Sequence, residues 1–410
     1  MSPEALFYIL IGIIILNFIW DTTLGILNAK HFSDPVPEEL EGVFDPEEYQ
    51  KSQRYKKESF RFGLLQSSLS LLVTLAFFFL DGFAWVDTMA RGVFTDPVGV
   101  GLLFFGIIMF ASDLLFTPFS YYRTFVIEEK YGFNKTTPKV FFLDKLKGWL
   151  LLGILGGGVL AALIVFYEWV GTSFWWYAWG LITLISILMN LFYARLIVPL
   201  FNKQTPLEEG SLRNQIETYA QQVGFELKNI FVIDGSKRST KANAYFSGFG
   251  NEKRITLYDT LINDLDETEI VAVLAHEVGH YKKRHIITNL FAGILSTGFT
   301  LWLLSLLIGN PILSEALQVS EPSFHIGLIA FTILFTPISE ITGLFMNMIS
   351  RKFEYQADRY AAGTYAAAPL INALKKLSKN SLSNLTPHPA FVYVHYSHPT
   401  LLQRVQHLKR

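Results

Sequence analysis

Residues 266–308 read DETEIVAVLAHEVGHYKKRHIITNLFAGILSTGFTLWLLSLLI and join a metal-binding motif to an apolar segment long enough to cross a membrane. The motif is HExxH, at 276–280. Asp266 and Glu269 have the spacing of a capping box, and the apolar residues that follow predict a helix. On that helix the two imidazoles lie one turn apart, and Glu277 is offset toward a metal-bound water. Composition predicts only about 0.01 chance matches to HExxH, so we interpret the motif as a metal site.

The motif assigns His276 and His280 as ligands of one Zn²⁺ per chain and Glu277 as the general base. A catalytic zinc usually takes a third protein ligand from another element. We assign it to Glu354, on a helix expected to continue from the last apolar segment. Asp358 lies one turn later and can accept an N–H from a liganding imidazole, which would fix its tautomer. The chain contains no Cys, so thiolate ligands and disulfides are excluded.

The composition indicates a membrane protein: 51% of the residues are hydrophobic and 17% are charged, against about 25% charged in typical soluble domains. A net charge of −1 argues against nucleic-acid binding. The apolar excess resolves into seven segments of about 20 residues, the length of a membrane-spanning helix. They are Leu6–Leu27, Phe62–Trp85, Val98–Phe119, Trp149–Tyr167, Phe174–Tyr193, Ile286–Ile308 and Ile326–Ile349.

The positive charges predict how the chain is oriented in the membrane. All but one of the 34 Lys and Arg residues lie in alternate connecting segments, and the exception is Arg91. Positively charged flanks stay in the cytoplasm. The pattern therefore predicts an external or lumenal N-terminus and a cytoplasmic C-terminus and catalytic domain.

The predicted fold is a mainly α, polytopic membrane protein with seven transmembrane helices, capped by an α+β zinc metalloprotease domain with a small β-hairpin or sheet. Strands are expected at Asn229–Ile233, Asn243–Phe249 and Arg254–Tyr258, the last two as a hairpin. The expected organisation is spans 1–5 in 1–194, with cytoplasmic loops 28–61 and 120–148. The first catalytic part is 195–285, spans 6 and 7 are 286–349, and the second catalytic part is 350–410.

Further motifs resemble the type 1 family of integral-membrane CAAX prenyl proteases, whose HExxH and downstream ExxxD form a gluzincin-type pattern. The matching stretches are FVIEEKYGFNKTT at 125–137, PLFNK at 199–203, SKRS at 236–239, NAY at 243–245, HEVGH at 276–280, EYQAD at 354–358, and His398-Pro399 with Arg404. The resemblance implies that the spans form a barrel around a large chamber. It also implies a zinc endopeptidase that hydrolyses peptide bonds near the C-terminus of prenylated CAAX-type or other membrane-associated proteins.

The resemblance also assigns substrate-contacting residues. Asn243, Ala244 and Tyr245 match the family's edge strand, against which an extended substrate would pair. His398 and Arg404 match positions that stabilise the developing oxyanion, although spacing alone leaves Tyr393, His395 and Tyr396 as competing donors.

The expected partners are a peptide or protein substrate, with or without an isoprenyl group, and membrane lipid; the oligomeric state is left open. The chain ends in HLKR, without a dilysine signal, which favours a bacterial inner membrane over the endoplasmic reticulum. Two alternatives are a non-catalytic receptor, chaperone or transporter with a structural metal, and an HtpX-like quality-control protease. An intact general base at Glu277 disfavours the first, and the number of spans disfavours the second.

Overall fold

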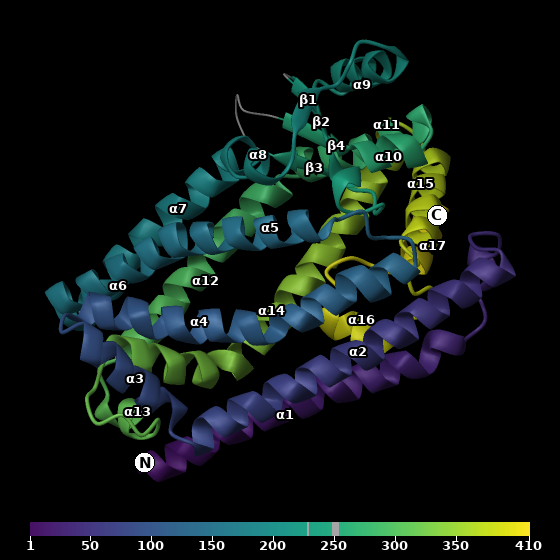
Figure 1. Cartoon of the computed structure of the whole chain (residues 1–410). Helices are drawn as coiled ribbons and strands as arrows, with labels where there is room; N and C mark the ends of the chain where they lie inside the picture. The colour runs from purple at the N-terminus through teal and green to yellow at the C-terminus, as the bar shows by residue number, and fades with distance from the viewer. Residues whose placement is uncertain (228, 248–253) are drawn as a thin grey trace.

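Helices make up most of the chain in the computed structural model, which describes residues 1–227, 229–247 and 254–410 (Figure 1). The long apolar helices lie side by side, and the small sheet with its helices covers one end of them. The helices of the apolar region are α1 (Pro3–Lys30), α2 (Pro46–Phe79), α3 (Gly82–Val93), α4 (Pro97–Tyr122), α5 (Pro138–Leu151), α6 (Gly157–Val170), α7 (Phe174–Leu196), α12 (His285–Leu307), α13 (Pro311–Glu315) and α14 (Phe324–Thr364).

The helices α1, α2, α4 and α5 each begin with a capping residue followed by Pro. The cap side chain accepts a backbone N–H from the first turn, and Pro suits the first helical position because no bond from its nitrogen is needed there. The pairs are Ser2-Pro3, Asp45-Pro46, Asp96-Pro97 and Thr137-Pro138. The starts of these helices are therefore set by local sequence.

Within the described residues, six helical ranges are long and apolar enough to cross a membrane, which confirms a polytopic membrane protein. The predicted number was seven. The difference lies in one 64-residue range, 138–201, which contains both α6 and α7. These two helices are joined at Gly171, which has a positive φ of 59°. The predicted fourth and fifth segments fall within this range.

The sheet has four strands, β1 (Gln204–Pro206), β2 (Asn229–Ile233), β3 (Ala244–Ser247) and β4 (Arg254–Tyr258), in the order β1-β2-β4-β3. β3 and β4 pair antiparallel, as the predicted hairpin requires, whereas β2 and β4 are parallel. The expected turn at 250–253 lies outside the described residues. β3 is the last strand in this order, so it forms an edge of the sheet as the structure describes it. β1, a strand of three residues, was not predicted from the sequence.

The two predicted catalytic parts pack around one core. The remaining helices are α8 (Val198–Phe201), α9 (Ser211–Gln222), α10 (Asp259–Asp264), α11 (Glu267–Lys282), α15 (Ala367–Asn380), α16 (Pro389–His395) and α17 (Leu401–Leu408). Buried apolar residues of α11, such as Leu274 and Val278, belong to the same hydrophobic cluster as Leu370 and Leu408 of the second part. The helix that carries HExxH is therefore held by both parts.

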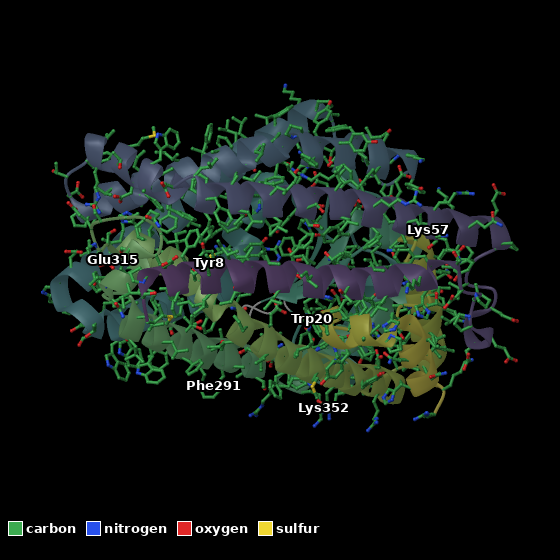
Figure 2. All side chains as sticks on the ribbon, turned by 90° about the horizontal axis from the view of Figure 1, so that it is seen from below. Tyr8, Trp20, Lys57, Phe291, Glu315 and Lys352 are labelled. Carbon is green, nitrogen blue, oxygen red and sulfur yellow. The ribbon has the colours of Figure 1, made fainter. Side chains whose placement is uncertain are left out.

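Two separate apolar cores lie at opposite ends of the long helices. At the sheet end, a core that includes Leu40, Ile127 and Leu385 joins the two predicted cytoplasmic loops to the second catalytic part. At the far end, α3 and α13 pack against α1, α4 and α14. Figure 2 shows Lys57 toward the sheet end and Glu315 toward the far end. Between these ends the outer surface is apolar, as a surface facing lipid must be.

Candidate metal centre

The close approach of α11 to α14 creates the site. A Cβ at Gly279 would lie 3.1 Å from both the Cα and the carbonyl oxygen of Ala357, and 3.2 Å from the Cβ of Tyr360. Glycine lets the two backbones come this close, and any larger residue would require a shift of a few tenths of an ångström. The packing accounts for a glycine inside the HExxH helix, where it costs about 1 kcal/mol of helix propensity relative to Ala.

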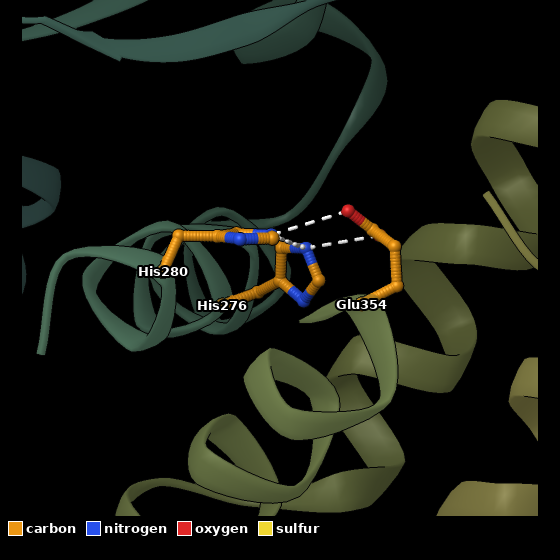
Figure 3. A group of neighbouring side chains, drawn as sticks. All are labelled: His276, His280 and Glu354. Carbon is orange, nitrogen blue, oxygen red and sulfur yellow. Dashed lines mark hydrogen bonds and ion pairs between the residues drawn. The ribbon is translucent and has the colours of Figure 1, made fainter. Parts of the chain in front are cut away.

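His276 and His280 point from α11 toward Glu354 on α14 (Figure 3). The two Nε2 atoms are 3.1 Å apart, and they lie 3.4 and 3.2 Å from Glu354 Oε2 and Oε1, respectively. Tetrahedral zinc with bonds of about 2.0–2.1 Å would place its ligand atoms about 3.3 Å apart. The spacing of these three side chains therefore suits a zinc ion without rearrangement of the helices.

Burial of the third ligand also fits a metal. Glu354 is 4% exposed, and its Oε2 is one of the buried side-chain atoms without a hydrogen bond in the described structure. A buried carboxylate oxygen without a hydrogen bond is costly unless a cation pairs with it. His276 Nε2 and Arg404 Nη1 lie 3.4 and 3.5 Å from this oxygen without a hydrogen bond to it. A metal ion between the two imidazoles and the carboxylate would supply a closer partner.

Asp358 fixes the orientation of the first imidazole. Its Oδ1 lies 2.9 Å from His276 Nδ1, so Asp358 accepts the Nδ1–H and leaves Nε2 directed at the metal position. Burial disfavours the charged form of His276, but hydrogen bonds to Asp358 and Glu354 outweigh it and raise the pKa of His276 to about 9. The additional proton, on Nε2, is the one that a bound metal must displace.

A second imidazole support was not found from the sequence. Gln356 Oε1 lies 2.8 Å from His285 Nε2, and His285 Nδ1 lies 3.0 Å from His280 Nδ1. If Gln356 accepts the Nε2–H of His285, then His285 accepts the Nδ1–H of His280, and the Nε2 of His280 is free for a metal. The His285 ring stacks on Phe353 at 4.0 Å, which holds its plane.

The sequence did not indicate a role for His285, because this residue lies on a different helix from the motif. α11 ends at Lys282, and Arg284 takes a left-handed φ of 59° before α12 begins. That sharp turn folds His285 back against His280. The only signal in the sequence is a histidine five residues after the motif, which predicts nothing without the turn.

Arg404 reaches the site from α17. It binds Asp358 through two nitrogens, at 2.9 and 2.5 Å, and its Nη1 lies 3.5 Å from Glu354 Oε2. Because the proton on His276 Nδ1 points to Asp358, Arg404 acts on this imidazole through the carboxylate. This contact gives Arg404 a role in positioning Asp358. Arg404 also lines the cavity beside the metal position, and its part in stabilising the oxyanion stays a prediction.

Glu277 faces a cavity of about 380 Å³ beside the metal position. Asn243, Ala244 and Tyr245 line the same cavity, so the edge strand β3 borders the metal site. Burial raises the pKa of Glu277, and the neighbouring His276 partly offsets the rise. A carboxylate with a raised pKa is suited to accept a proton and later release it.

His398 lines this cavity too, with its Nε2 3.4 Å from Glu354 Oε1. Arg351 positions the preceding segment by donating to the carbonyls of Val392, Tyr393 and Tyr396 at the end of α16. Asn347 adds a 2.6 Å bond to the carbonyl of Val394.

The three competing donors lie elsewhere. His395 and Tyr396 line a different cavity, and the hydroxyl of Tyr393 faces the sulfur of Met348 at 3.4 Å. The residues described as lining the metal cavity include none of the three.

Two family models together match nearly the whole chain. Residues 25–203 match the model described as "CAAX prenyl protease N-terminal, five membrane helices", and residues 206–410 match peptidase family M48. The boundary between the two matches falls at β1, within the predicted first catalytic part at 195–285.

Full-length relatives and a solved structure agree with these models. The chain is 36% identical to a CAAX prenyl protease 1 homolog of Oryza sativa subsp. japonica, covering 96% of this chain and 95% of the relative. It is 35% identical to the CAAX prenyl protease 1 of Saccharomyces cerevisiae, covering 97% and 94%. The crystal structure of S. mikatae Ste24p aligns with a TM-score of 0.94, 34% identity and 99% coverage of both chains.

These relatives are eukaryotic and give no support to the expected bacterial membrane. The non-catalytic alternative and the HtpX-like alternative are not favoured by the comparisons either. A matched metalloprotease domain, relatives of the same length and the converging His, His and Glu side chains lead to one assignment: this chain is a membrane metalloprotease of peptidase family M48 and belongs to its CAAX prenyl protease branch.

Proposed function

We propose that the chain is a zinc endopeptidase that hydrolyses peptide bonds near the C-terminus of prenylated CAAX-type membrane proteins. The observation that carries the proposal is the convergence of His276, His280 and Glu354 on one point, with Glu277 beside it in a cavity bordered by an edge strand. The names of the relatives support the substrate class.

The side chains divide the reaction between them. A bound zinc ion would polarise the scissile carbonyl and a water molecule. Glu277 takes the proton of the attacking water and delivers it to the leaving amine. His398 reaches the cavity with a ring N–H that can donate to the developing oxyanion. The outer side of β3 pairs with the extended substrate backbone and holds the scissile bond over the metal position.

The test uses the purified full-length protein in detergent and a farnesylated peptide that ends in Cys-Ala-Ala-Leu. We expect about one zinc per chain by elemental analysis and cleavage that stops with a chelator and returns with zinc. Glu277→Gln should lower kcat by about 10²- to 10⁴-fold while retaining the metal. Glu226→Gln, at an exposed position of the same domain, is the control. Unchanged turnover with the chelator or in Glu277→Gln refutes the proposal.

We also propose that the chain crosses the membrane seven times, because α6 and α7, which lie in one of the six helical ranges, each cross it. A gluzincin-like domain then lies on the cytoplasmic face. A cavity of about 460 Å³ among α1, α2 and α4, lined by Asn17, Gln66 and Ser70, supports a polar chamber within the spans. The chain has no Cys, so a single cysteine at Arg91 reports sidedness directly. Labelling of that position only from the cytoplasmic side contradicts the orientation.

A further inference from the structure

A second cavity adjoins the metal cavity, and His398 lines both. The second cavity has a volume of about 350 Å³. Lys56 enters it from α2, Ser378 and Ser383 enter it from α15 and the segment that follows, and residues 395–401 form the remaining wall. The two cavities therefore share His398 as a wall residue.

Lys56 is the cation of this cavity, and it lacks a carboxylate partner. Among the described residues no Asp or Glu oxygen lies within ion-pair distance of its Nζ. Neighbouring lysines have one: Lys130 pairs with Glu58 at 2.7 Å, and Lys241 pairs with Glu128 at 2.9 Å. Lys56 instead lines the cavity, and its Nζ lies 5.4 Å from the centroid of the Tyr55 ring.

Two further cations lie near Lys56. Burial disfavours the charged form of Lys56, as do Lys241 and Arg123, and Glu128 opposes these effects. Glu128 is already occupied, because the Tyr55 hydroxyl donates to it at 2.6 Å and Lys241 at 2.9 Å. None of the residues described as lining the cavity is acidic. The site therefore carries a positive charge that an anionic ligand would neutralise.

Uncharged donors complete the site. The residues that line the cavity include Ser378, Ser383, Ser397 and Thr400, which carry hydroxyls, and Asn384, which carries a side-chain amide. Hydroxyl hydrogens rotate, so a serine or threonine that accepts one bond can still donate another. Thr400 Oγ1, for example, accepts from the Gln403 backbone at 3.2 Å and keeps its own hydrogen. A carboxylate has about four acceptor positions, which one ammonium and several hydroxyls can fill.

The position of the cavity beside the metal cavity indicates which anionic group of a substrate could reach it. An extended peptide advances about 3.3 Å per residue, so a cavity that shares a wall residue with the metal cavity is within reach of a segment of two or three residues beyond the scissile bond. A segment that short ends in the α-carboxylate of the substrate. We propose that the cavity around Lys56 binds the free C-terminal carboxylate of the substrate and thereby sets the cut a few residues from the end. This proposal rests on the proteolytic function proposed above.

The experiment compares two farnesylated peptides that end in Cys-Ala-Ala-Leu, one with a free carboxylate and one with a C-terminal amide. For the unmodified enzyme we expect kcat/KM to be about 10- to 100-fold higher for the acid, as expected for a hydrogen-bonded charge. Lys56→Met should abolish most of that preference and leave cleavage of the amide unchanged. Lys56→Arg should keep the preference.

Lys57→Met is the matched control, because Lys57 is the next residue of the same helix, is exposed and donates to Ser33 at 2.7 Å. It should retain the full preference. Equal cleavage of acid and amide by the unmodified enzyme, or an undiminished preference in Lys56→Met, overturns the proposal. The first comparison needs no variant, so misfolding of Lys56→Met does not prevent the test. Cleavage of the amide peptide reports the protease itself, so loss of proteolysis is distinguishable from loss of carboxylate recognition.

Discussion

Substitution of Gly279 by alanine tests whether the contact between α11 and α14 controls the metal site. The added Cβ would lie 3.1 Å from Ala357 backbone atoms, which cannot move as a flexible side chain does. The two helices must separate by a few tenths of an ångström. His276 and His280 lie on one helix and Glu354 on the other, so the separation opens the metal site.

Two opposing effects determine the stability change. Alanine in a helix interior is favoured over glycine by about 1 kcal/mol, and overpacking costs about 1–3 kcal/mol. The free energy of unfolding should therefore fall by only about 0–2 kcal/mol. Metal sites tolerate changes of about 0.2 Å in ligand distances, so zinc binding should weaken more clearly, by about tenfold or about 1.4 kcal/mol.

Zinc affinity is measured by competition with a chromophoric chelator, and thermal unfolding in detergent is followed with and without zinc. Gly363→Ala is the control because it lies on α14, gains the same helix propensity, and its Cβ meets no atom within 4 Å. The zinc-dependent rise in Tm should be smaller for Gly279→Ala than for the control. Equal zinc affinity in the two variants would refute the contact argument.

Three further substitutions test the supports of the site. His285→Phe keeps the ring stacked but removes the hydrogen bond to the second imidazole, so zinc affinity should fall about 10- to 100-fold, as chelator competition would show; an unchanged affinity contradicts the tautomer argument. Arg404→Met leaves the buried Asp358 carboxylate without its cation and should lower the stability in detergent by about 3–5 kcal/mol; a small loss would show that water replaces the guanidinium. Arg238→Met removes a bidentate ion pair to Asp144 at 2.7 and 2.9 Å and should loosen the contact between the catalytic part and α5. The expected result is faster proteolysis of the segment that carries residue 238, with the zinc content unchanged.

Local sequence determined the long apolar helices and the metal motif, because each depends on residues close together in the chain. A run of about 20 apolar residues forms a spanning helix whatever surrounds it. The capping box at Asp266 fixes where α11 begins, as the structure confirms. The number of spans was less certain from composition, because α6 and α7 follow one another with only a short turn at Gly171.

The role of Arg404 depended on tertiary structure. The resemblance implies an oxyanion donor, and the structure adds a contact of the guanidinium with both oxygens of Asp358 that the sequence did not indicate. The donor expected from His398 still lines the metal cavity, whereas the competing tyrosines and His395 lie elsewhere. Spacing along the chain cannot decide such questions, because α16 and α17 are separated by a turn.

The sequence by itself determined that this is a membrane protein with an HExxH helix and named Glu354 as the residue to complete the site. Tertiary structure alone decided that His285 supports His280 and that Lys56 reaches a cavity beside the metal, since these contacts join residues from different helices. The physical reason is that helix formation and apolar periodicity are local properties of the chain. Convergence of side chains depends on how closely the helices pack, and at this site Gly279 sets that distance.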